Sequence, residues 1–161
     1  MTDPIRPTDD EARTLARQLM QDARYAAMGV IQDNGLPLVT RTGFGLSTAG
    51  APLCLVSALS AHTRALQANP GCSLLVGEPG PKGDPLNHPR LSLTGTISFV
   101  RHGAPGHAEM AAAYLRSHPK AKLYIGFADF SLLRFEIRGA HLNGGFGKAF
   151  HLSPADLGIS G

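Results

Sequence analysis

The feature that most constrains this sequence is residues 91–100, where apolar and hydroxyl side chains alternate. A period of two places the two sets on opposite faces of a β-strand. The apolar set is Leu91, Leu93, Ile97 and Phe99, and the polar set is Ser92, Thr94, Thr96 and Ser98. The segment is therefore the strongest strand prediction in the chain.

The other elements follow from hydrophobic period and turn signals. We expect strands at residues 25–31, 36–44, 53–56, 72–76 and 131–138, with a further one at 140–145. Helices are expected at residues 8–23, 61–68 and 106–117. A capping box of Thr8 and Glu11 is expected to begin the first helix. The Pro- and Gly-rich residues 78–89 are predicted to form a long loop.

Length and composition favour one β-rich domain. The chain has 161 residues, including 19 Gly and 12 Pro, which suit many turns and short elements. Most predicted strands are joined by turns of hairpin length. We therefore expect residues 1–161 to form a single, mainly β (α+β) domain, an antiparallel barrel with helices at its margins.

Several classes of protein are excluded by pattern. No run of about 18 apolar residues is present, so no transmembrane helix is expected. The N-terminus lacks a basic-then-apolar run, and we expect a cytoplasmic location. A net charge of +3, scattered along the chain, favours small anionic ligands over nucleic acid. Cys54 and Cys72 lack metal-site spacing and suit a reducing compartment. Cys54 is expected to be an inert core thiol, and Cys72 to begin a buried strand.

The densest polar cluster lies at residues 57–64, where a strand is expected to end and a helix to begin. It contains Ser57, Ser60, His62, Thr63 and Arg64. Free N–H groups at a helix N-terminus, hydroxyls and cations together suit a phosphate group. A plain helix cap with solvated side chains is the other interpretation, and the sequence leaves both open.

Two arginines and a glycine-rich segment are further candidates. Arg41 lies within the apolar stretch 36–44, where a cation must face solvent, an acid or an anionic ligand. Arg90 begins the alternating strand and allows the same interpretations. Residues 143–148 contain three glycines, which permit close approach of backbone to a ligand or simply a flexible turn.

The seven histidines do not form a zinc-site spacing, so no protein-built metal site is expected. His141 and His151 flank the glycine-rich segment and are the candidates for an axial haem ligand. Simple exposure is the alternative for each. No Ser–His–acid or Cys–His signature is present, and no catalytic residue is assigned.

Several short runs, taken in order, carry a family resemblance. They are Arg41-Thr42-Gly43-Phe44, Ser60-Ala61-His62-Thr63, Arg90-Leu91-Ser92-Leu93-Thr94-Gly95, Phe127-Ala128-Asp129-Phe130 and Gly144-Gly145-Phe146-Gly147-Lys148-Ala149. Over about residues 14–152 the chain resembles the FMN-binding split-barrel family of pyridoxamine 5′-phosphate oxidase. The likeness is greatest to the HugZ-type haem-utilisation branch of that family.

The resemblance implies a six-stranded antiparallel split β-barrel with flanking helices, working as a homodimer with FMN between its subunits. The cofactor-binding residues it implies are Arg41, Thr42, Ser57, Ser60, His62, Thr63, Arg90, Phe146 and Lys148. Among them Ser57, Ser60, His62 and Thr63 would hold the phosphate. Oxidases of this family commonly have a lysine where His62 stands, and a histidine donates fewer hydrogen bonds.

Three functions compete at this stage. The leading hypothesis is an FMN-dependent oxidoreductase acting on an unidentified small molecule, in which the cofactor carries the chemistry. The second is haem binding or haem breakdown without flavin, with His141 or His151 as the ligand. The third is a non-enzymatic dimeric regulator that has lost the cofactor.

Overall fold

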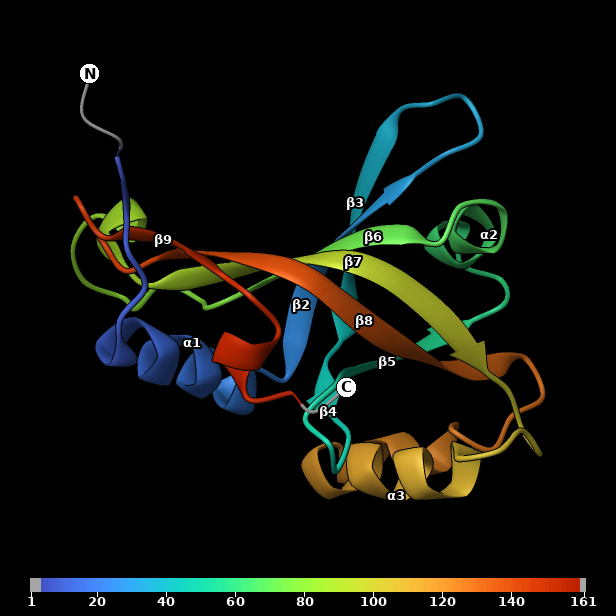
Figure 1. The fold of residues 1–161 in the computed structure, drawn as a ribbon. Helices are drawn as coiled ribbons and strands as arrows, with labels where there is room; N and C mark the ends of the chain where they lie inside the picture. Colours follow the sequence, from blue (N-terminus) through green and yellow to red (C-terminus); the bar gives the residue numbers. More distant parts are fainter. Residues whose placement is uncertain (1–3, 160–161) are drawn as a thin grey trace.

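The computed structural model describes residues 4–159, and its strands share one sheet (Figure 1). The N-terminal stretch, in which no secretory signal is expected, begins at Met1 and lies partly outside these residues. The strands are β1 Ile5–Arg6, β2 Tyr25–Ile31, β3 Pro37–Gly43, β4 Gly45–Leu46, β5 Pro52–Ser57, β6 Gly71–Val76, β7 Arg90–Val100, β8 Phe130–Asn143 and β9 Ala149–Leu152. The helices are α1 Asp10–Asp22, α2 Ala61–Ala68 and α3 His107–Ser117, with 3₁₀ turns at Pro85–Asn87, Pro119–Leu123 and Ala155–Leu157.

The long strands β7 and β8 organise the sheet, which runs in the order β1-β9-β8-β7-β6-β2-β3. Strand β8 pairs with β7 along most of its length, with β5 through its first half and with β9 through its second. A bulge in β7 falls between Thr94 and Gly95. A Cβ at Gly95 would overlap the carbonyl oxygen of Glu136, so glycine is needed where β7 presses on β8.

The expected six-stranded antiparallel barrel needs three corrections. The described residues contain nine strands, and β1 pairs with β9 in parallel. No pairing joins β3 to β4 or β5 within residues 4–159, so the sheet is open on that side. The two-residue strands β1 and β4 are too short to show a period, and β1 finds its partner more than 140 residues away.

The core lies between the sheet and its helices. Helix α1 covers one face of the sheet and buries Ala12, Ala16 and Met20 in the same cluster as Leu91 and Leu93. A second cluster lies under α3, where Ala113 and Tyr114 pack near Leu53 and Leu132. In Figure 1 both helices lie below the sheet, which leaves the opposite face of β6, β7 and β8 uncovered.

Most predicted elements are present, with local differences. The Thr8–Glu11 capping box is wrong: the Asp9 carboxylate accepts the N–H of Ala12, and α1 begins at Asp10. The Thr8 hydroxyl donates to the carbonyl of His151 instead. A carboxylate one residue later competes successfully because it is a stronger acceptor. Residues 131–138 and 140–145, expected as two strands, belong mainly to the single strand β8.

Candidate functional site

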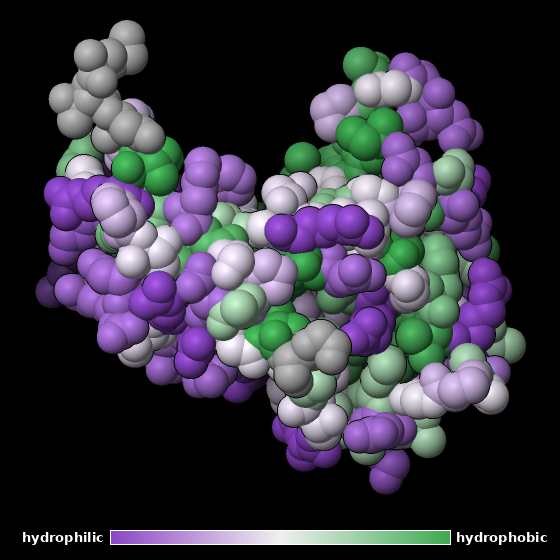
Figure 2. All heavy atoms as spheres, viewed as in Figure 1, coloured by the Kyte–Doolittle hydropathy of each residue, from purple (hydrophilic) through white to green (hydrophobic). Residues whose placement is uncertain are grey.

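The face of the sheet opposite α1, called here the outer face, carries one row of side chains across six strands. Because paired residues share a face, the strand registers place the row without ambiguity. From β3 to β9 the row is Arg41, Ala27, Leu75, Ser92, His141 and His151. Figure 2 shows the surface hollowed between the β2–β3 hairpin and the β9 end of the sheet.

His141 and His151 form a cross-strand pair at the β9 end of this row. Their ring centroids are 4.4 Å apart and their planes are nearly perpendicular, at 85°. Both side chains are exposed, and no hydrogen bond to their ring nitrogens is present within the described residues. By contrast, four other histidines each have a ring nitrogen within hydrogen-bond distance of an oxygen atom: His62, His88, His102 and His118. The pair therefore has nitrogen lone pairs available for a ligand.

Arg90 lies on the outer face beside this pair. It is two residues before Ser92, the partner of His141, so it is a diagonal neighbour of His141 with Cα atoms about 7–8 Å apart. Its Nη1 donates to the carbonyls of Leu86 at 2.8 Å and His88 at 3.3 Å. The loop before β7 thus holds the Arg90 guanidinium on its carbonyl groups, at a strand position diagonal to His141.

The glycine-rich segment closes the same corner. The Asn87 side chain accepts the N–H of Phe146 at 3.3 Å and so joins residues 85–87 to residues 144–148. The ring of Phe146 is 76% exposed, and Lys148 is exposed as well. Lys148, however, lines a hollow on the α1 side together with Leu15 and Phe150. We call Arg90, His141, Phe146 and His151 the β9-side group.

The predicted phosphate residues lie elsewhere, at the end of β5 and the N-terminus of α2. We call Ser57, Ser60, His62 and Thr63 the α2 group. The Ser57 hydroxyl donates to the Asp129 carboxylate at 3.1 Å, and His62 Nδ1 lies 3.0 Å from the Thr40 hydroxyl. Burial lowers the pKa of His62, which favours its neutral form. A carboxylate and a neutral imidazole both weaken attraction for a phosphate dianion.

Two residues of this α2 group favour a ligand. Ser60 occupies the cap position of α2, and its side chain makes no capping hydrogen bond. Thr63 is only 2% exposed, and its Oγ1 has no hydrogen-bond partner in the described part of the chain. A buried hydroxyl without a partner costs about 1–3 kcal/mol. The α2 group therefore keeps unsatisfied hydrogen-bonding capacity beside its unfavourable carboxylate.

The remaining predicted residues divide between the two faces of β3. The side chain of Arg41 is exposed on the outer face, with its guanidinium 5.3 Å from the Tyr25 ring centroid. Thr42 is buried on the opposite face. Four strand spacings separate Arg41 from His141, about 19 Å. Within one chain the nine predicted FMN residues thus do not surround one pocket.

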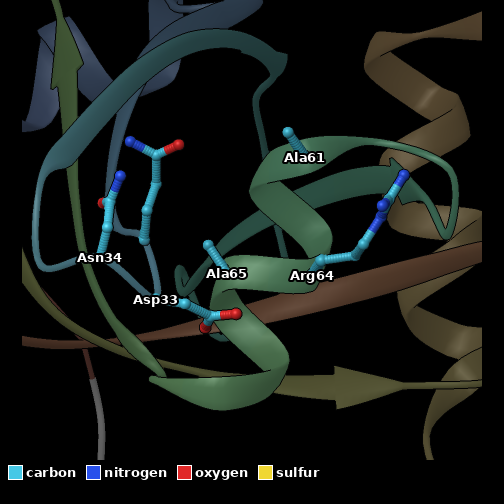
Figure 3. A pocket seen from close by; sticks show the side chains of 6 residues that line it. Asp33, Asn34, Ala61, Arg64 and Ala65 are labelled. Carbon is cyan, nitrogen blue, oxygen red and sulfur yellow. The ribbon is translucent and has the colours of Figure 1, made fainter.

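A further hollow lies beside the α2 group, between that helix and the turn of the β2–β3 hairpin. Its volume is about 350 Å³, and it is lined by Gln32, Asp33, Asn34, Ala61, Arg64 and Ala65. Figure 3 shows Arg64 pointing away from the turn residues Asp33 and Asn34, with the small side chain of Ala65 on the helix between Asn34 and Arg64. None of the predicted cofactor residues lines this hollow.

Three residues that contact the site were not selected from the sequence: Thr40, Asn87 and Asp129. Asp129 and Ser57 are 72 positions apart, and Asn87 and Phe146 are 59 apart. No local spacing could have joined them. The sequence offered a signal for Asp129 alone, because it lies within the Phe127-Ala128-Asp129-Phe130 run that carries the family resemblance.

The two cysteines lie in the core, as expected. Burial raises the pKa of Cys54 and of Cys72 to about 12. Within residues 4–159 no group of three or more His, Cys, Asp and Glu side chains could hold a metal ion. No helix in that range is both long and apolar enough to cross a membrane.

Comparison with known proteins identifies a family. The sequence model described as "CREG, beta-barrel" matches residues 7–157. The chain is 34% identical over 116 residues to the chloroplastic heme oxygenase HOZ of Arabidopsis thaliana, a match covering 72% of this chain. The matched part is 34% of that relative, so the chain corresponds to about a third of its length.

Two solved structures share the fold. A heme binding protein from Mycobacterium smegmatis is 27% identical with a TM-score of 0.83, covering 96% of this chain and 61% of that one. A general stress protein 26-related protein of the pyridoxinephosphate oxidase family, from Clostridium acetobutylicum, is 15% identical with a TM-score of 0.69. That match covers 93% of this chain and 99% of the other. The split-barrel family resemblance with haem-related members is thereby confirmed.

Proposed function

Since this chain belongs to the CREG β-barrel family, which has split-barrel relatives of the pyridoxinephosphate oxidase type, we propose that it binds haem on its outer face. The named relatives at 34% and 27% identity are a heme oxygenase and a heme binding protein. The observation that carries the proposal is the exposed His141–His151 pair beside Arg90.

The β9-side group fits the chemistry of haem. A neutral imidazole with a free nitrogen is a common axial ligand of haem iron. The Arg90 guanidinium suits a propionate carboxylate, and the exposed ring of Phe146 offers apolar surface to the macrocycle. Bound haem would supply the redox and oxygen chemistry, while these side chains bind and orient it.

Only one of the two histidines can ligate the iron. The two rings stand side by side on one face of the sheet, so they would approach a bound haem from the same side. Only one of them would therefore hold the iron. The second histidine would contact the bound haem without holding the iron.

A second copy of the chain is part of the proposal. Strands β2 and β3 and the turn between them expose apolar side chains: Tyr25, Ile31, Leu36 and Val39. Leu75 adds a further exposed apolar side chain to the outer face. Clustered apolar surface of this kind marks an interface. We expect a homodimer whose subunits meet over the hollowed face and enclose the ligand.

The experiment is a haemin titration followed by the Soret band, on the wild-type protein and on the variants His141→Ala and His151→Ala. The expected result is one haem per subunit, with ligation lost in one variant and retained at weaker affinity in the other. His102→Ala is the matched control, because His102 is also exposed but has its Nε2 on the Phe127 carbonyl. Ascorbate added to the complex then tests haem breakdown by loss of the Soret band.

Haem binding with an unchanged spectrum in both histidine variants would refute the proposed site. Arg90→Ala gives a second reading, because it should weaken haemin binding without changing the iron spectrum. Circular dichroism establishes that each variant is folded. If haemin does not bind the wild-type protein at micromolar concentration, the function itself is refuted.

FMN is the second candidate, favoured by the unpartnered Thr63 hydroxyl and the uncapped Ser60 at the start of α2. If FMN is the ligand, its fluorescence is quenched when it binds, and the double variant Ser60→Ala, Thr63→Ala loses this quenching. Asp129→Asn should strengthen FMN binding, because it removes a negative charge next to Ser57. Absence of any quenching would eliminate this candidate.

A further inference from the structure

The His141–His151 pair has a geometry that haem cannot use in full. Haem takes one imidazole from this side, whereas a bare metal ion can take two neighbouring ones. Transition-metal ions such as Zn²⁺, Ni²⁺ and Cu²⁺ bind neutral imidazole nitrogen. The pair can therefore be compared with the geometry of a two-histidine chelate.

Ring separation is the test of that comparison. With metal–nitrogen bonds of about 2.0–2.1 Å, the centroid of a ligating imidazole lies about 3.2 Å from the metal. Two imidazoles on one metal ion, with a nitrogen–metal–nitrogen angle of about 90–110°, then have ring centroids about 4.5–5.2 Å apart. The observed separation of 4.4 Å is just below the lower end of this range, and because the rings stand edge to face at 85°, at least one exposed ring must turn to direct a nitrogen at a shared ion.

The backbone fixes the positions of the two residues. His141 and His151 are directly paired, and their neighbours Leu142–Phe150 and Ala140–Leu152 are paired as well. Phe150, Leu142 and Leu152 are buried, which anchors both strands to the core. Pairing on two anchored strands limits the entropy lost when a metal joins the rings.

The other histidine pair does not offer the same site. His102 and His107 have centroids 4.7 Å apart, but His102 Nε2 is 3.0 Å from the Phe127 carbonyl oxygen. His107 lies at the first position of α3 and is not held by a strand pairing. These residues provide a matched control at nearly the same ring separation.

The geometry points to a two-imidazole chelate: we propose that His141 and His151 together bind one divalent first-row transition-metal ion per chain. Within residues 4–159 no third side chain of the metal-ligating types completes a cluster, so water fills the remaining positions. The neighbouring Arg90 cation opposes a metal ion and keeps the affinity moderate. The inference does not depend on haem binding, because it concerns the haem-free protein.

The experiment is isothermal titration of the haem-free protein with ZnCl₂, supported by electron paramagnetic resonance of the Cu²⁺-loaded protein. We expect one Zn²⁺ per chain with micromolar affinity, and Cu²⁺ hyperfine structure from two nitrogen ligands. His141→Gln and His151→Gln should each weaken Zn²⁺ binding more than tenfold, because either change removes the chelate. The double variant His102→Gln, His107→Gln should bind Zn²⁺ as the wild-type protein does.

Equal dependence on both histidines separates this site from the haem site, for which one histidine suffices. Zn²⁺ binding that survives in either single variant would overturn the chelate, as would Cu²⁺ hyperfine structure from one nitrogen. Loss of binding in the His102, His107 double variant would move the site to that pair and also overturn it. Zn²⁺ binding without haemin binding would leave this inference intact while refuting the proposed function.

Discussion

The junction between residues 85–87 and 144–148 gives the sharpest test of how the β9-side group is built. Gly145 has φ of +120°, and a Cβ there would lie 2.9 Å from Asn87 Oδ1 and 3.2 Å from its carbonyl oxygen. The same Asn87 side chain accepts the N–H of Phe146. Gly145→Ala is therefore expected to displace the loop that orients Arg90.

Two contributions set the magnitude. Left-handed backbone costs an alanine about 1–2 kcal/mol, and the lower entropy of the unfolded alanine chain offsets about 0.4–1 kcal/mol. The net loss of about 1 kcal/mol lowers Tm by about 2–4 °C in a chain of this size. The contact with Asn87 also displaces the loop that orients Arg90, and this displacement should weaken haemin binding roughly tenfold, or by about 1.4 kcal/mol.

Gly147→Ala is the matched control. Its φ is +70°, but the nearest atom to its Cβ is the end of the flexible Arg6 side chain at 3.5 Å. It should lower Tm by a similar amount and leave haemin affinity unchanged. Thermal denaturation by circular dichroism and haemin titration measure the two quantities separately. If the two variants bind haemin equally, contact with Asn87 does not support the ligand site and the reasoning is refuted.

Three further predictions concern assembly, acid stability and thiol reactivity. Val39→Asp, at a side chain 69% exposed, should shift the protein from dimer to monomer in sedimentation; a monomeric wild-type protein would contradict this. The hydrogen bond from Arg13 lowers the pKa of Asp156 to about 2, so its stabilisation is complete above about pH 4 and is lost as pH falls towards 2. Urea unfolding at pH 5 and pH 2.5 should show a smaller acid loss in Asp156→Asn than in wild type. Because burial raises the pKa of Cys54 to about 12, it should react with a thiol reagent at pH 8 only in urea, and rapid native reaction would disprove its burial.

Much of the local structure could be predicted because it depends on local chemistry. The alternation at residues 91–100 predicted β7, and the turn at Gly35, with φ of +81°, separates two predicted strands. Helix α2 has the predicted bounds. The prediction of an element failed where its stability comes from a partner strand far away in the sequence. The two-residue strand β1 exists only because β9 lies beside it.

The candidate site shows the same division. Arg90, His141 and His151 could be selected from the sequence because cations and imidazoles bind few kinds of ligand. Their meeting on one face depends on the registers of β7, β8 and β9, which no spacing in the sequence reveals. The separation of Arg41 from Thr42 follows from the strand period, whereas their distance from Arg90 follows from strand order. Residue chemistry and local period are properties of the sequence, while the neighbours of each side chain are decided by pairings between residues far apart in the chain.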